Sequence, residues 1–224
     1  MTDGPVYRNR AEAGARLADR LARFAHRNVV VLALPRGGVP VAEVIANRLD
    51  APLDVYVVRK VGAPGNPEYG LGAVGEGGTI LLDRARVEEL GLGPHDLDDE
   101  VHRQLQEVES RLRRFRAGRE PVPVEGTIVI LVDDGVATGG TARAAVRALR
   151  MRRPQRLVLA VAVASSQAYD ALASEVDEIV CPCIPLNFFA VGEWYRDFSE
   201  VTDEQVVAIL ARHPPPLAGT VGRG

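Results

Sequence analysis

Cysteine is almost absent from the chain, since the 224 residues include only Cys181 and Cys183. The two lie two positions apart in an apolar segment, a spacing that rarely forms a disulfide and gives too few ligands for a closed zinc site. We therefore expect two small, buried residues on a strand. A cysteine hydrolase is a weak alternative, because no histidine lies near them in the sequence.

Long apolar runs and long basic runs are also missing. The longest apolar run is the eight residues 157–164, far short of the ~20 needed to cross a bilayer. No run of five basic residues occurs, and 27 Lys and Arg against 30 Asp and Glu give a formal charge of −3. This balance argues against nucleic acid or a membrane as the main partner. The N-terminal segment has no apolar stretch of the secretory type, so a cytoplasmic location is the default expectation.

What remains is an ordinary globular composition, with 46% apolar and 25% charged residues. The length favours one domain with an embellishment. Apolar runs alternate with segments of helical spacing, and each run is apolar at consecutive positions, as in parallel strands covered by helices on both faces. We therefore predict a doubly wound α/β domain with a mostly parallel five-stranded sheet, its strands near 28–34, 53–58, 127–132, 156–164 and 178–183.

Three segments depart from this alternation. Residues 61–78 are rich in Gly, and we expect a flexible lid loop rather than a packed element. Residues 96–117 carry apolar side chains at steps of three and four, which predicts a long inserted helix. Residues 184–212 combine an aromatic stretch with a short helix that starts near Thr202, and the tail 213–224 is expected to be disordered.

The most specific motif is IVILVDDGVATGGT, residues 128–141, in which a buried strand leads through two acids and a Gly/Thr loop into a helix. A helix N-terminus presents unpaired N–H groups and a favourable dipole, so it suits a phosphate. Asp133 and Asp134 are placed to accept hydrogen bonds from sugar hydroxyls or to ligate a divalent metal. Phosphate at one end and a diol at the other describe a sugar phosphate. Neither GxxxxGK[ST] nor a helix-opening GxGxxG occurs, which excludes the rival phosphate motifs.

The spelling LVDDGVATGGT resembles the signature of the type I phosphoribosyltransferases, which bind 5-phosphoribosyl-1-pyrophosphate. The resemblance implies that Asp133 and Asp134 hold the ribose and stabilise charge on it. It also implies a 5′-phosphate loop made of Gly135, Val136, Ala137, Thr138, Gly139, Gly140 and Thr141. A strand-to-helix turn with solvated aspartates is the structural alternative.

A second strand-to-helix turn, LPRGGVPVA at 34–42, resembles the pyrophosphate loop of the same family, with Arg36, Gly37 and Gly38 as its binding residues. Lys60 and, more weakly, Arg59 follow the second predicted strand, where the family places a basic residue that holds pyrophosphate. A solvated strand end explains Arg59 equally well. The resemblance implies Arg36 and Lys60 as catalytic groups, Mg²⁺ as cofactor and segment 61–78 as the family's mobile catalytic loop.

The likeness extends to most of the chain, in RKVGAPGNPEYGLGAVGEGG and PLNFFAVGEWYRDFSEVTDEQV, which are similar to stand-alone bacterial predicted phosphoribosyltransferases of unsettled acceptor. It implies a phosphoribosyltransferase domain over 1–212, with lid and helical insertion at about 61–118 and a hood at about 184–212. The expected reaction transfers the phosphoribosyl group to a nitrogenous base or related small acceptor. A regulator that senses the same ligand without turnover is the alternative.

Five of the 11 aromatic residues fall between positions 188 and 198. Phe188 and Trp194 are candidates for stacking an acceptor base, as in the family's hood. A packed C-terminal flap or a homodimer contact would use the same side chains. Ala137 stands where hypoxanthine-guanine enzymes usually carry an acid that handles the purine ring proton. This sequence has no acid at that position.

Overall fold

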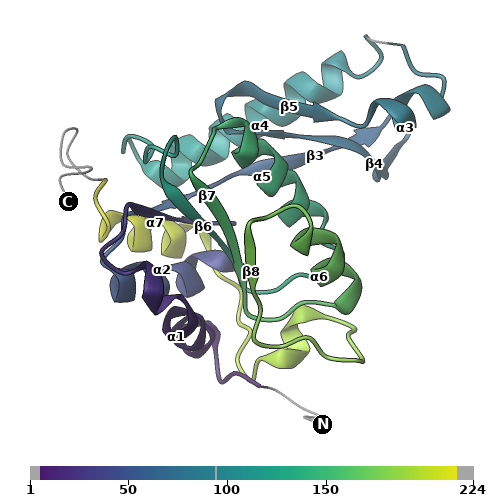
Figure 1. The fold of residues 1–224 in the computed structure, drawn as a ribbon. Coiled ribbons are helices and arrows are strands. Elements are labelled where there is room, and N and C mark those ends of the chain that lie inside the picture. Colours follow the sequence, from purple (N-terminus) through teal and green to yellow (C-terminus); the bar gives the residue numbers. More distant parts are fainter. Residues whose placement is uncertain (1–5, 94, 216–224) are drawn as a thin grey trace.

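The computed structural model describes residues 6–93 and 95–215 (Figure 1). Its centre is a five-stranded sheet with the order β2-β1-β6-β7-β8, in which all neighbours are parallel. These strands are β1 (Val29–Ala33), β2 (Leu53–Val55), β6 (Ile128–Asp133), β7 (Arg156–Val161) and β8 (Glu178–Val180). The predicted α/β class and parallel sheet are confirmed.

Helices cover both faces of this sheet because its strands are apolar on both sides. One face packs against α1 (Arg10–Leu21), the short η1 (Ala22–Phe24), α2 (Gly38–Leu49) and α7 (Asp203–Ala211). The other packs against α5 (Gly140–Met151) and α6 (Ser166–Ala173). Within β1, Val29 and Val31 belong to the first core, whereas Val30 and Leu32 belong to the second. The loops that follow β1 and β6 are thereby fixed at the carboxyl ends of the strands.

A second, antiparallel sheet lies beyond the first, with the order β3-β4-β5 (Figure 1). Its strands are β3 (Val58–Ala63), β4 (Asn66–Gly75) and β5 (Thr79–Leu82), with η2 (Glu76–Gly78) before β5 and α3 (Arg84–Glu89) after it. The long helix predicted at 96–117 is present as α4 (Asp98–Arg116). Both α4 and α5 contact this sheet, so it is covered on two sides.

The prediction of a lid loop at 61–78 without packed elements is wrong, because this segment forms the second half of β3, all of β4 and η2. Val61, Leu71 and Val74 are buried between the helices. Gly72 allows the close approach of β4 to β5, since a Cβ there would overlap the Leu81 carbonyl oxygen. The glycines thus permit packing in a sheet with two covered faces, whereas their number in the sequence predicts a loop.

The C-terminal segment 184–212 contains η3 (Val191–Trp194) and α7. It is attached to the N-terminal segment through a bridge between Tyr7 and Tyr195, and the Tyr7 hydroxyl donates to the Ala162 carbonyl oxygen at 2.7 Å. Of the predicted disordered tail, residues 216–224 lie outside the described residues. Within the described part of the chain, no helix is long and apolar enough to cross a membrane.

Candidate functional site

The two predicted binding loops lie side by side because β1 and β6 are neighbours, with Ala33 opposite Val132. The Leu34 N–H donates to the Val132 carbonyl oxygen at 2.9 Å, and the chain then turns into the loop that contains Gly37 and Gly38. The Pro35–Arg36 peptide bond is cis. A Cβ on Gly38 would lie 2.6 Å from the Val132 carbonyl oxygen, and one on Gly37 would overlap the Asp134 carboxylate. Glycine at both positions is therefore what lets the loops meet.

We expect Gly38→Ala to destabilise the protein by about 1–3 kcal/mol, because the Val132 carbonyl belongs to a sheet strand and cannot move aside. Gly140→Ala is the matched control, since the nearest atom to its added Cβ is 4.0 Å away and Ala is favourable in a first helical turn. Urea denaturation of both variants measures the difference. Equal midpoints for the two would show that the close approach of the loops is not required.

The two acids lie at the junction of the loops, and they have different partners. Asp134 is 8% exposed, and its Oδ2 accepts a hydrogen bond from Arg10 Nε at 2.8 Å. Asp133 accepts from the Asp134 backbone N–H at 2.9 Å. Burial, and next the neighbouring Asp134 carboxylate, raise the pKa of Asp133 well above its usual range. Ionisation of Asp133 is therefore unfavourable in the folded protein, and a cationic or hydrogen-bonding ligand beside it would offset this cost.

Arg10 is a site residue that no sequence motif indicated. Its Nη1 donates to the Ser199 carbonyl oxygen at 2.7 Å, and its guanidinium lies 4.0 Å from the Phe198 ring centroid. Phe198 stacks on Tyr195, whose hydroxyl donates to the Asp134 carbonyl oxygen at 2.5 Å. Part of the predicted aromatic cluster therefore holds the acids in place. No signal in the sequence connects position 10 with position 134.

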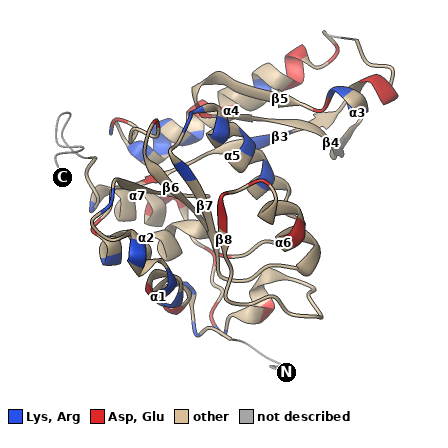
Figure 2. Cartoon of the chain, in the orientation of Figure 1, with Lys and Arg blue, Asp and Glu red and all other residues tan. Residues whose placement is uncertain are grey.

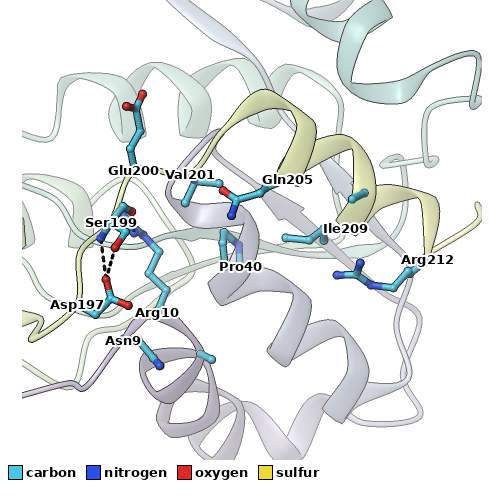
Figure 3. A pocket seen from close by; sticks show the side chains of 12 residues that line it. Asn9, Arg10, Pro40, Asp197, Ser199, Glu200, Val201, Gln205, Ile209 and Arg212 are labelled. Carbon is cyan, nitrogen blue, oxygen red and sulfur yellow. Dashed lines mark hydrogen bonds between the residues drawn. The ribbon is translucent and has the colours of Figure 1, made fainter.

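Arg10 also lines a cavity of about 370 Å³ between the starts of α1 and α2 and helix α7 (Figure 3). Pro40 and Ile209 form apolar parts of its wall. On the Arg10 side, Asp197 accepts from the Ser199 backbone N–H at 3.0 Å. Arg10 thus contacts both the acid pair and this cavity.

The predicted phosphate loop leads into α5, as the motif indicated. Gly139 has φ +80° and precedes the helix with no side-chain cap, so the first N–H groups of α5 have no side-chain acceptor. The Thr138 and Thr141 hydroxyls make no hydrogen bond to any described residue. Gly135 contacts the hood, because a Cβ there would overlap Val191. This loop can accept an anion through backbone and hydroxyl donors.

Arg59 and Lys60 are separated by the structure, because neighbouring residues on a strand point to opposite faces. Arg59 Nε donates to Gln104 Oε1 of α4 at 3.0 Å, so this side chain does not join the two loops. Lys60 faces α5 and lines a groove together with Thr138 and Thr141. The placement of Arg59 at the crevice is therefore corrected. Lys60 lies beside the predicted phosphate loop.

The Arg36 side chain turns toward the C-terminal segment. Its guanidinium is 40% exposed and pairs with Glu200 at 2.5 Å and with Asp203 at 3.7 Å. Both acids follow the aromatic segment, where no sequence pattern indicated a partner. An anion that approaches the loop therefore competes with two carboxylates for Arg36.

The two aromatic candidates also differ. Phe188 lines a cavity of about 340 Å³ with Ala137, Thr138 and the start of α6, beside the phosphate loop. Trp194 is 7% exposed, and its carbonyl oxygen accepts the N–H groups of Val6 and Tyr7. Trp194 is thus part of the packed core, which corrects its assignment to the acceptor, and Phe188 remains a candidate.

Two other chemistries find little support. Burial raises the pKa of the Cys181 thiol to about 12, so a reactive thiolate is disfavoured. Among residues 6–93 and 95–215, no three His, Cys, Asp or Glu side chains gather as a metal site. A divalent ion near Asp133 would need most of its ligands from substrate or water.

The chain is similar to known proteins over most of its length. The family model described as "Phosphoribosyl transferase domain" matches residues 9–197. A curated protein of Mycobacterium tuberculosis, "Putative phosphoribosyl transferase", is 45% identical over 207 residues, which are 92% of this chain and 47% of that protein. The chain thus spans about half the length of the curated relatives it matches. The crystal structure of TT1426 from Thermus thermophilus is 46% identical, with a TM-score of 0.84 over 93% of this chain and 99% of that one.

Proposed function

The chain belongs to the phosphoribosyl transferase domain family, and on this basis we propose that it transfers the phosphoribosyl group of phosphoribosyl pyrophosphate to a nitrogenous acceptor and releases pyrophosphate. The observation that carries the proposal is the junction of two glycine loops over an acid pair. The Gly37–Gly38 turn and the loop before α5 are anion sites of the backbone type. Asp133 and Asp134 lie between them.

Each group then has a role that its surroundings support. The loop from Gly135 to Thr141 binds the 5′-phosphate through N–H groups and hydroxyls. Asp133 and Asp134 accept hydrogen bonds from ribose hydroxyls and stabilise the positive charge that develops on the sugar. Gly37, Gly38 and Arg36 bind the leaving pyrophosphate, once Arg36 leaves Glu200. Lys60 approaches the donor from the phosphate side.

Asp133 is the carboxylate that would hold Mg²⁺, because the Asp134 carboxylate already accepts a hydrogen bond from Arg10. Oxygen donors are the ligands Mg²⁺ prefers, and it usually keeps several waters or substrate oxygens. When bound, the ion neutralises charge on the leaving pyrophosphate. The raised pKa of Asp133 is the property of this chain that a nearby cation would reverse.

For the acceptor, we propose the cavity lined by Phe188. Ser165, Ser166 and Gln167 supply neutral polar groups there, and the lining carries no charged side chain among the described residues. A flat, uncharged ring with hydrogen-bonding edges fits this chemistry. The cavity adjoins Thr138, so an acceptor there would lie near a sugar whose phosphate sits in the loop.

We expect Phe188→Ala to raise the KM for the acceptor about 3- to 10-fold, because an aromatic stacking contact contributes about 0.5–1.5 kcal/mol. The rate at saturating acceptor should change little. Met151→Ala is the control, since this apolar side chain is 60% exposed and does not line the cavity. Steady-state kinetics with both variants measures the difference, and an unchanged KM in Phe188→Ala would remove the cavity as acceptor site.

Calorimetric titration with phosphoribosyl pyrophosphate, with and without Mg²⁺, tests the proposal. The wild type should bind the ligand, and more tightly with the ion. Gly38→Ala should weaken binding, whereas the surface variant Arg153→Ala should not, because that side chain is 79% exposed and pairs with Glu125 at the surface. Failure of the folded wild type to bind would refute both the transferase and its regulatory alternative.

A further inference from the structure

A groove of about 510 Å³ runs along α5 on the side that faces the second sheet. Its walls come from β3, β4, β5, the start of α3 and α5, so it exists only because segment 61–78 is folded as a sheet. One end is lined by Thr138, Gly140 and Thr141 of the phosphate loop, and the other reaches Arg147. The helical stretch from Thr141 to Arg147 is about 9 Å long along the axis. The groove is therefore longer than a single phosphate group.

The charge in this groove is mainly positive. Lys60, Arg86, Arg143 and Arg147 line it, and Asp83 is the acid among its described lining residues. Figure 2 shows basic positions along α5 below the second sheet. Outside the groove, Glu175 pairs with Arg143 at 2.6 Å and with Arg147 at 2.9 Å. The three arginines alone outnumber these two carboxylates, which leaves a positive excess.

The arginine side chains are also reachable from solvent. Arg86, Arg143 and Arg147 are 53%, 47% and 50% exposed. Arg86 Nη1 donates to the Gly70 carbonyl oxygen at 3.2 Å and its Nε lies 3.3 Å from Asp83, so this guanidinium is held at the groove wall with donors to spare. Asp83 and Arg86, at the start of α3, and Arg147 of α5 line the same groove, so its two walls both carry arginine.

We propose that this groove binds an elongated polyanion, a chain of two or more phosphates, as a second ligand distinct from the phosphoribosyl donor. Arginine side chains on both walls bind phosphate oxygens through charge-assisted hydrogen bonds. The hydroxyls of Thr138 and Thr141 are shared with the 5′-phosphate loop, so the two ligands influence each other's binding. By linkage, the effect on affinity is the same in both directions. The proposal rests on the proposed function only for this coupling.

The source of the phosphate chain is either an inorganic polyphosphate or a nucleoside polyphosphate. Val58, Leu71 and Leu81 give the groove an apolar wall beside its cations, which could receive a nucleoside. Titrations with tripolyphosphate and with a nucleoside triphosphate therefore form the two arms of the test. Tighter binding of the nucleotide assigns the wall to the nucleoside, and equal binding assigns the site to the phosphates alone.

The decisive variants change the groove charge in both directions. The double variant Arg86→Ala/Arg147→Ala should weaken tripolyphosphate binding about tenfold or more. Asp83→Asn should strengthen it, because Asn removes the opposing charge and still caps α3. Arg153→Ala is the control for a general charge effect. If the double variant is unstable, Arg86→Ala alone serves the same purpose, since its side chain is exposed.

The failure of this inference is distinguishable from failure of the proposed function. Tripolyphosphate binding that is unchanged in the groove variants but lost in Arg36→Ala would place the anion at the pyrophosphate loop and overturn the inference. Absence of tripolyphosphate binding to the folded wild type would also overturn it. Binding of phosphoribosyl pyrophosphate to the groove variants, within about threefold of wild type, is the expected result. Absence of donor binding in the wild type refutes the proposed function and leaves the groove result standing.

Discussion

Asp133→Asn should make the ligand-free protein more stable and at the same time lower turnover by about 10²- to 10³-fold. Burial and the adjacent Asp134 raise the pKa of Asp133 in the folded protein. The folded state therefore binds a proton more tightly than the unfolded state. The stability from this group is fully present below the unfolded pKa of about 4 and is lost as pH rises through the higher folded value. Asn carries no such charge.

Melting temperatures of wild type and Asp133→Asn over a pH series measure this effect. The two curves should coincide near pH 4 and separate above it, with the variant higher. Asp19→Asn is the control, because its side chain is 71% exposed and a surface change of this kind should stay within about 0.5 kcal/mol. Parallel curves for wild type and Asp133→Asn would show that ionisation of Asp133 does not destabilise the folded protein.

Arg116→Met should cost about 3–5 kcal/mol, because it leaves the buried Asp54 carboxylate without its ion-pair partner and Glu76 with Arg152 alone, at 3.3 Å. The Arg116 guanidinium pairs with Asp54 at 2.8 Å and with Glu76 at 2.9 Å, and these side chains are 10%, 1% and 9% exposed. Asp54 belongs to β2 of the main sheet, and Glu76 precedes β5 of the second. The ion pairs from α4 therefore connect the two sheets.

Urea denaturation compares this variant with Arg114→Met on the same helix. Arg114 is 58% exposed and pairs with Asp203 and Glu204 at the surface, so its loss should cost at most about 1 kcal/mol. A similar small cost for both variants would contradict a connecting role for Arg116. A larger cost for Arg116→Met than for Arg114→Met is the expected result. It would show that these ion pairs stabilise the contact between the two sheets.

The central sheet could be predicted because β1, β6 and β7 are apolar at consecutive positions, a pattern typical of strands that are buried on both faces. Helix α4 could also be predicted, because its apolar residues recur at steps of three and four. The second sheet was missed because its glycines are informative only once α4 and α5 are known to cover it. The Arg116–Glu76 pair joins residues 40 positions apart, a contact that no local pattern reveals.

The candidate site shows the same division. The two glycine loops and the acid pair follow from local strand-to-helix motifs, and the order of β1 and β6 in the sheet brings them together. Arg10 is 124 positions from Asp134, and its role depends on how the C-terminal segment packs. Strand alternation also separates Arg59 from Lys60, which the sequence alone would treat as one basic pair.

Pyrophosphate release from phosphoribosyl pyrophosphate and Mg²⁺, measured across a panel of nitrogenous bases, tests the proposed transfer most directly. Asp133→Asn and Asp134→Asn serve as controls. The account predicts release that depends on at least one acceptor in the wild type and that falls sharply in both variants. Tight donor binding without release for any acceptor would contradict transfer and favour a regulator that senses the ligand.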